Sequence, residues 1–464
     1  MKKTFRFSPK GTLLAAVSTA ALIASPVTQA ADFDTDISAF YRVSAYGVQN
    51  KNINTQRNVT DNDTGISHVL RIGLDLKDKE TGIALFSSVE LAGERWQGNR
   101  RDYGTQVAQF NETVRSDDIR LDYAYISLPI SEYGKLNIGR QTTSYNNCLL
   151  VCEGRRDRVS LLQPLTPTLM GIINYDRNSD TESFNRIDNG DLVFFGVMGK
   201  VKNLDVGFLN FHWLHNYKGD VGTQPGATPT DPAHGLHALS GVHMISAYVG
   251  GNINEDVKLT TGFNYNNNGR VKHPVHEGKF FNKRSVAAYL RAEADIENFG
   301  LGLQWVGAID GGLISPGFDT YSSLINNSPD ATSTPTSMYH MGGETGWRNA
   351  DDHVIATKLD YHATDKVTLT AALGNLRIKR PDLVNGGSNS DHSMFYDLQA
   401  SYKPNPKLHV WATLGLLKKN KVGTLKGNPH LYRKAAPANA NANIFGTFAN
   451  KDVVAGSLNA VVRF

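Results

Sequence analysis

The chain has 464 residues, of which 40% are hydrophobic and 20% charged, with 43 glycines and two cysteines. At about 150 residues per domain this length suggests three domains, but no Pro-rich or Ser-rich linker divides it, so we expect one large architecture. The one apolar run that approaches a membrane helix covers residues 13–24, and a spanning helix needs about 20 apolar residues. The composition therefore excludes a helical membrane protein.

The N-terminal segment is typical of an export signal. Four basic residues within the first ten precede the apolar run, and the small residues Thr28 and Ala30 occupy the two positions that a signal peptidase reads. We predict a signal peptide over residues 1–30 and a mature chain over residues 31–464. Removing four basic residues and no acidic ones takes the formal net charge from +4 to 0. This removes the electrostatic argument for a nucleic-acid partner.

From residue 31 onward, apolar and polar residues alternate with a period of two. This spacing puts successive side chains on opposite faces of a β-strand, and helical periodicity is nearly absent. The alternation is clearest in residues 37–45, 70–76, 119–125, 257–265, 301–307 and 408–416.

The connections between these runs are tight and long in turn. The tight ones cover residues 78–82, 131–134, 202–203, 252–256, 297–300, 364–366 and 404–406. The long ones cover residues 48–66, 94–117, 144–188, 215–240, 267–284, 310–350, 379–391 and 419–452. Fifteen connections join 16 strands of about ten residues, the length that a tilted strand needs to cross a bilayer.

An open sheet edge would leave unpaired backbone groups in lipid, so such a sheet must close on itself. We therefore predict an all-β fold: a single 16-stranded antiparallel transmembrane β-barrel with short periplasmic turns and long external loops. A soluble β-sandwich is the alternative, but loops sorted by length in this way are unusual for one.

One phase of the alternation should face the water inside the barrel, because charged side chains on the lipid face are costly. The predicted inward phase carries many charges of both signs. They are Arg42, Arg71, Asp75, Glu90, Arg120, Asp122, Arg140, Lys258, Arg291, Glu293, Asp295, Lys358, Asp360 and Asp397.

Three segments resemble general bacterial porins of the Gram-negative outer membrane. Residues 123–128 (Tyr-Ala-Tyr-Ile-Ser-Leu) and 133–141 (Tyr-Gly-Lys-Leu-Asn-Ile-Gly-Arg-Gln) resemble the strand, turn and strand before the porin constriction loop. Residues 186–190 resemble the segment after that loop, and Phe464 resembles the terminal aromatic assembly signal. The resemblance implies a homotrimer and a third long loop that folds into the lumen.

By this resemblance, residues 144–188 would be the constriction loop. Acidic loop residues would then face a basic wall, for which the candidates are Arg42, Arg71, Arg120 and Arg140. The segment lacks the porin Pro-Glu-Phe-Gly-Gly stretch and instead carries a charged run. Because of this run, the sequence leaves open whether the channel would prefer anions or cations. That run is Glu153, Arg155, Arg156, Asp157 and Arg158.

The only two cysteines, Cys148 and Cys152, lie four residues apart in the same segment. An exported protein meets an oxidising compartment, which favours a disulfide between them. A metal site would need further ligands, and none lies close by, so we expect no metal and no cofactor.

The sequence thus predicts a passive outer-membrane channel for small hydrophilic solutes and ions, with outer-membrane lipid and lipopolysaccharide as its surroundings. A substrate-specific channel for sugars, carboxylates or amino acids is the alternative, and it would need an aromatic track or a dense arginine ladder. A barrel enzyme is a third possibility, but known membrane-barrel enzymes have fewer strands.

Overall fold

The structure is a computed structural model. It describes residues 33–54, 59–95, 120–177, 191–214, 239–267, 270–271, 282–326, 336–337, 339, 341–342, 348–381, 388–418 and 452–464. The predicted signal peptide, residues 1–30, lies outside the described residues. Among those that are described, no helix is long and apolar enough to cross a membrane.

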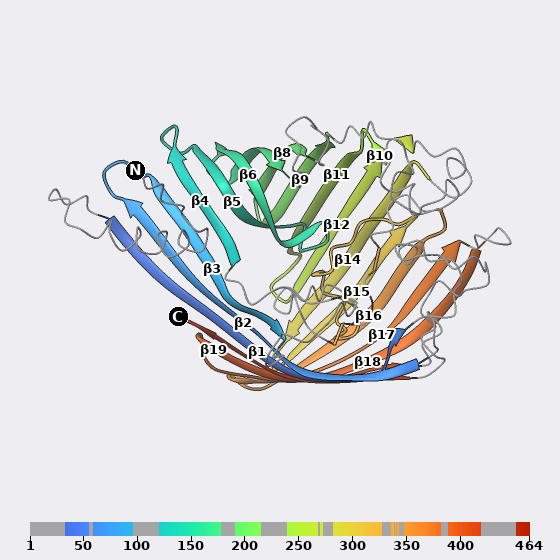
Figure 1. Ribbon diagram of the computed structural model, residues 1–464. Coiled ribbons are helices and arrows are strands. Elements are labelled where there is room, and N and C mark those ends of the chain that lie inside the picture. Colours follow the sequence, from blue (N-terminus) through green and yellow to red (C-terminus); the bar gives the residue numbers. More distant parts are fainter. Residues whose placement is uncertain are drawn as a thin grey trace, which may run out of the picture.

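The described chain forms one closed antiparallel barrel (Figure 1). Its strands are β1 (Phe33–Asn54), β2 (Val59–Asp78), β3 (Ala84–Arg95), β4 (Arg120–Pro129), β5 (Lys135–Tyr145), β6 (Val151–Thr166), β7 (Leu169–Arg177), β8 (Leu192–Val201), β9 (Leu204–Trp213), β11 (His243–Asn252), β12 (Val257–Asn267), β14 (Arg284–Ile296), β15 (Phe299–Ile309), β16 (Asp351–Thr364), β17 (Val367–Pro381), β18 (Ser388–Asn405), β19 (Leu408–Lys418) and β20 (Val453–Arg463). Two short strands, β10 (Leu239–Ser240) and β13 (Arg270–Val271), pair separately.

Each barrel strand pairs with the one before it, and the barrel closes where β20 pairs with β1. The terminal residue takes part in this closure. The backbone N–H of Phe464 donates to the carbonyl oxygen of Ala39 at 2.9 Å, and the N–H of Ala39 donates back at 3.2 Å. The hydrogen bonds between β1 and β20 therefore extend to the last residue of the chain.

The predicted all-β closed antiparallel barrel is confirmed, but the predicted count of 16 strands is wrong, because the barrel has 18. The two additional strands, β6 and β7, lie within residues 144–188, which the sequence analysis treats as one long loop. These strands escape the alternation rule for two reasons. Charges crowd β6 from Glu153 to Arg158, and β7 begins with apolar residues on both faces.

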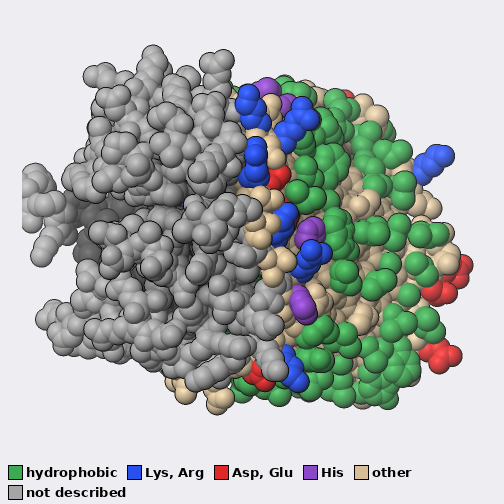
Figure 2. All heavy atoms as spheres, turned by 90° about the vertical axis from the view of Figure 1, so that its right-hand side faces the viewer, with side chains coloured by type: hydrophobic (Ala, Val, Ile, Leu, Met, Phe, Trp, Pro, Cys, Tyr) green, Lys and Arg blue, Asp and Glu red, His purple; other side chains and the backbone are tan. Residues whose placement is uncertain are grey.

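The outer face of the barrel carries large apolar side chains exposed to the surroundings. On β15 to β18, Leu303, Ile355, Leu373 and Leu398 are each about half exposed or more (48–59%). A hydrophobic band covers this side of the molecule, and Lys, Arg and His side chains line one of its edges (Figure 2). Such a band is what a barrel wall in contact with lipid requires.

The strands are joined by tight turns at one end, which we call the turn end, and mainly by longer connections at the other, which we call the loop end. In the turn between β2 and β3, the Asp78 carboxylate accepts hydrogen bonds from the N–H of Glu80 at 2.9 Å and the hydroxyl of Thr81 at 2.9 Å. These bonds hold the pKa of the exposed Asp78 carboxyl below its ordinary value. Strand β1 begins at the turn end, and strand β20 ends there.

Candidate functional site

The interior of the barrel is crossed by the hairpin of β5 and β6. Its tip, residues 145–150, lies against the far wall (Figure 1). The buried Nδ2 of Asn146 lies 2.9 Å from Ser246 Oγ on β11 and 3.2 Å from the carbonyl oxygen of Phe263 on β12. Asn147 Nδ2 donates to the Tyr289 hydroxyl on β14 at 2.6 Å. The tip is therefore bonded to three strands on the opposite side.

Backbone conformation and a close approach explain how the tip fits. Asn146, Asn147 and Cys148 all have positive φ angles, between 48° and 65°, a conformation that asparagine adopts more readily than most residues. Gly262 makes room for the tip, because a Cβ there would lie 2.2 Å from Asn146 Oδ1. Cys148 and Cys152 form a disulfide that closes the base of the tip, with their Cα atoms 4.5 Å apart.

The connection between β15 and β16 also folds into the barrel. Its described residues include 311–326, which run along the inner wall and meet the hairpin tip. The N–H of Ser315 donates to the carbonyl oxygen of Leu149 at 2.8 Å, and a Cβ on Gly317 would lie 2.4 Å from Cys152 Cβ. The two inserted segments therefore contact each other directly.

Buried polar groups anchor this connection to the wall. The Asp397 carboxylate on β18 accepts hydrogen bonds from the Ser322 hydroxyl at 2.9 Å and from the N–H of Ser323 at 3.0 Å. The Asp352 carboxylate on β16 accepts a hydrogen bond from the Tyr339 hydroxyl at 2.9 Å and one from the N–H of Gly342 at 2.7 Å. Two carboxylates thus hold its two halves.

Apolar packing fills the space between this connection and the wall of β14 to β20. Phe318 and Leu324 are completely buried, as are the inward wall residues Val354 and Phe395. Arg291 on β14 lies over the Phe318 ring, 5.5 Å from its centre, and donates to the carbonyl oxygen of Asp319 at 2.9 Å. This side of the interior is therefore a packed core that reduces the space available for water.

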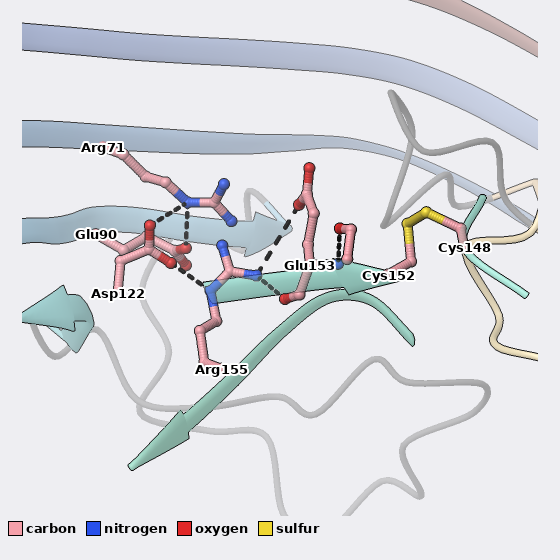
Figure 3. A network of polar contacts seen from close by, with 8 residues as sticks. Arg71, Glu90, Asp122, Cys148, Cys152, Glu153 and Arg155 are labelled. Carbon is pink, nitrogen blue, oxygen red and sulfur yellow. Dashed lines mark hydrogen bonds and ion pairs between the residues drawn. A yellow bond between two sulfur atoms is a disulfide. The ribbon is translucent and has the colours of Figure 1, made fainter. Parts of the chain in front are cut away.

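The opposite side of the interior carries a network of charges (Figure 3). Arg71 on β2 lies 3.1 Å from the Glu90 carboxylate on β3 and 3.5 Å from the Asp122 carboxylate on β4. Arg155 on β6 binds Asp122 at 2.5 Å and also lies 3.9 Å from the carboxylate of Glu153. The network therefore ties the hairpin to the wall from which it departs.

A second ion pair lies further along the hairpin. Nε and Nη2 of Arg158 contact the two carboxylate oxygens of Asp176 on β7 at 2.5 and 2.6 Å, and both side chains are buried. Such a two-point contact fixes the orientation of the guanidinium group. Arg156 lies on the same face of β6, because the register pairs it with the buried Gln141.

The structure divides the four predicted basic-wall residues. Arg42 and Arg71 lie inside the barrel, Arg42 being 7% exposed. Arg140 does not line the interior, because its register places it on the face of the exposed Ile138, where it lies 3.4 Å from Asp157. Arg120 begins β4, but its side chain lies outside the described residues.

The five residues predicted for the constriction loop are not in a loop. Glu153, Arg155, Arg156, Asp157 and Arg158 all belong to strand β6, because residues 151–177 form the two strands β6 and β7. The part of this segment that enters the barrel is the hairpin tip together with the adjoining first half of β6. Charges are tolerated on both faces of β6 because its first half lies inside the barrel, where neither face meets the outer surface.

Sequence reasoning missed the two features that narrow the interior: the anchoring Asn146 and the inserted connection between β15 and β16. For the second, a signal is present. Residues 313–325 contain five large apolar side chains, and a connection exposed to water would not need them. They are Leu313, Ile314, Phe318, Leu324 and Ile325.

The fold and its narrowed interior define a class, that of barrels with the architecture of outer-membrane channels. No family model matches the chain, and no curated protein matches its sequence. Solved structures of Pseudomonas aeruginosa proteins are similar in fold. OccK9 (OpdG) has a TM-score of 0.55 at 12% identity, over 93% of this chain and 98% of its own. The outer membrane protein OprD has a TM-score of 0.55 at 10% identity, over 94% and 95%. OpdK, solved with vanillate, has a TM-score of 0.53 at 11% identity, over 93% and 98%.

Proposed function

We propose that the mature chain, residues 31–464, is an outer-membrane channel of a Gram-negative bacterium. It carries small hydrophilic solutes and ions by passive diffusion and performs no covalent chemistry. The observation that supports this best is a closed barrel, apolar outside, whose interior combines charged walls with two inserted segments. A barrel built only for stability would have no reason to hold buried charges beside an inserted hairpin.

The two ends of the barrel give its orientation. Long connections of membrane barrels face the outside of the cell and short turns face the periplasm, so the loop end is external. The hydrophobic band then lies within outer-membrane lipid, with lipopolysaccharide in the outer leaflet. Residues 1–30 direct export in this proposal. The homotrimer implied by the porin resemblance is part of the proposal as well, and mass measurement of the detergent-purified protein tests it.

Between a general pore and a substrate-specific channel, the geometry favours the specific one. The hairpin tip lies on the far wall, and the packed connection fills the side of β14 to β20. The space that remains for solutes is on the side lined by Arg42, Arg71 and Arg158 and their carboxylate partners. Such a passage selects by size and by the placement of charge. Because the structure of OpdK was solved with vanillate, small organic anions are the first solutes to test.

Liposome swelling tests this proposal. Purified mature protein is reconstituted into liposomes, and swelling is followed in solutions of uncharged sugars, amino acids and organic anions of graded size. We expect uptake of small solutes with a sharp size limit and a preference among solutes of equal size. Uptake that depends on size alone would support the general pore. No uptake of any solute would refute the channel.

A further inference from the structure

A cavity of about 320 Å³ opens on the outer surface of the barrel, away from the interior site. It lies at the loop end of strands β16, β17 and β18. Its lining is polar and includes the cationic side chains of Arg377 and Lys379. The lining residues are Asp351, His353, Arg377, Lys379, Ser388 and Ser390.

The register shows that this cavity lies on the outer face. His353 is two residues before Ile355 on β16, so both side chains point to the same side, and Ile355 is 59% exposed on the outside. Arg377 pairs with His353 across the sheet, and Lys379 pairs with Asp351. The cationic groups are therefore outside the barrel, separated from the interior by the sheet itself.

The cavity lies just above the hydrophobic band. Below the pair of His353 and Arg377, the next outward row contains Trp305 and Ile355, and the row after that contains Leu373. Two residues along a strand advance about 6.7 Å, so the cationic groups lie one such step above the apolar rows. The His353 and Trp305 rings are nearly parallel, with their centres 6.2 Å apart, which places an aromatic side chain at the boundary.

The cations belong to a wider belt. Lys, Arg and His side chains form a row along one edge of the hydrophobic band (Figure 2). Within the cavity, Lys379 Nζ lies 3.4 Å from the Asp351 carboxylate, while Arg377 is exposed. An arginine with two nearby serine hydroxyls and a lysine is suited to bind phosphate oxygens.

We infer that this cavity binds the phosphorylated headgroup of an outer-leaflet glycolipid, with the acyl chains on the apolar rows below it. This inference rests on the proposed location in the outer membrane. The cavity lies on the outer face directly above the apolar rows, and this favours a lipid over free phosphate. Arg377 and Lys379 contact the phosphate, Ser388 and Ser390 donate hydrogen bonds to it, and Ile355 and Leu373 contact the chains.

Titration of lipid A onto the purified protein tests the inference. The mature protein is refolded in detergent free of lipopolysaccharide, and native mass spectrometry counts bound diphosphoryl lipid A. The test variant is Arg377→Ala with Lys379→Ala. The matched control is Lys366→Ala with Lys403→Ala, which removes two exposed lysines from the turn end of the same strands. Fully dephosphorylated lipid A and inorganic phosphate are the comparison probes.

We expect at least tenfold weaker lipid A binding in the test variant and unchanged binding in the control, with weak binding of the dephosphorylated lipid to all three proteins. Equal binding of lipid A by the test variant and the wild type would overturn the inference. Displacement of lipid A by millimolar inorganic phosphate would overturn the choice of a lipid.

Conductance of the same samples separates the two proposals. The site lies outside the passage, so both variants should conduct as the wild type does. A protein that binds lipid A through Arg377 and Lys379 but conducts no ions would refute the channel and leave the lipid site standing. A protein that conducts ions but binds lipid A equally well without Arg377 and Lys379 would refute the lipid site and leave the channel standing.

Discussion

The hairpin tip should be held in place chiefly by Asn146. The Asn146→Ala change removes the Nδ2 group that lies 2.9 Å from Ser246 Oγ, 3.3 Å from the carbonyl oxygen of Ala247 and 3.2 Å from that of Phe263. A hydrogen bond contributes about 0.5 to 1.5 kcal/mol net, and a buried group left unpaired costs about 1 to 3 kcal/mol. Some acceptors keep their strand partners, so we expect a loss of about 2 kcal/mol in the seating of the tip.

This loss has a measurable consequence. At about 1.4 kcal/mol per factor of ten, 2 kcal/mol raises the ratio of released to seated tips about 30-fold. Single-channel recording of Asn146→Ala should therefore show larger and more variable conductance than the wild type, because the tip no longer stays across the passage.

Asn459→Ala is the matched control, since Asn459 is also a buried inward asparagine but bonds Ser457 on the β20 side, at 2.9 Å. It should leave the conductance level unchanged. If Asn146→Ala conducts as the wild type does, with the same open-channel noise, the hairpin tip is not what narrows the passage.

Three further predictions address other parts of the interior. Reduction of the Cys148–Cys152 disulfide should increase open-channel noise without unfolding the barrel, and the reductant should have no effect on the Cys148→Ser, Cys152→Ser double variant. Arg71→Ala removes a positive charge beside Glu90 and Asp122, so the reversal potential in a KCl gradient should shift toward cation preference. Asp122→Asn should shift it the opposite way, and a shift of the same sign in both variants would contradict the network. Phe318→Ala empties a completely buried position, a change that typically costs about 3 to 5 kcal/mol, so limited proteolysis should cut the connection between β15 and β16 faster. Phe299→Ala, at an exposed outer position, should not accelerate cleavage.

Much of the wall could be predicted from the sequence, because contact with lipid on one face and polar groups on the other imposes a strict period of two. Leu301, Leu303 and Trp305 alternate with glycine and glutamine, and they lie on the outer face as this pattern predicts. The inward carboxylates Glu90 and Asp122 follow from the same rule, and both are buried.

The rule fails where a strand leaves the wall. Residues 151–156 of β6 lie inside the barrel, so neither face needs to be apolar, and the charged residues there predict a loop instead. The pattern also assigns Arg140 to the interior, whereas its register on β5 gives it the phase of Ile138, which is on the outer face.

The contacts that narrow the interior are not local in sequence, and this is why they could not be predicted. Asn146 reaches residues about 100 to 118 positions away, and Ser322 reaches Asp397 over 75 positions. A single buried asparagine carries no periodic signal. Only the excess of apolar residues in 313–325 indicates that this connection is packed rather than exposed.

We propose that this closed barrel, with its narrowed and charged interior, conducts selectively. Single-channel recording of the purified mature protein in planar bilayers tests it most directly, first in KCl and then with small organic anions, sugars and amino acids added. We predict discrete, small conductance steps that one class of solute blocks in a saturable manner. Absence of any conductance from correctly folded protein would contradict the claim, and large steps insensitive to every solute would contradict the selectivity.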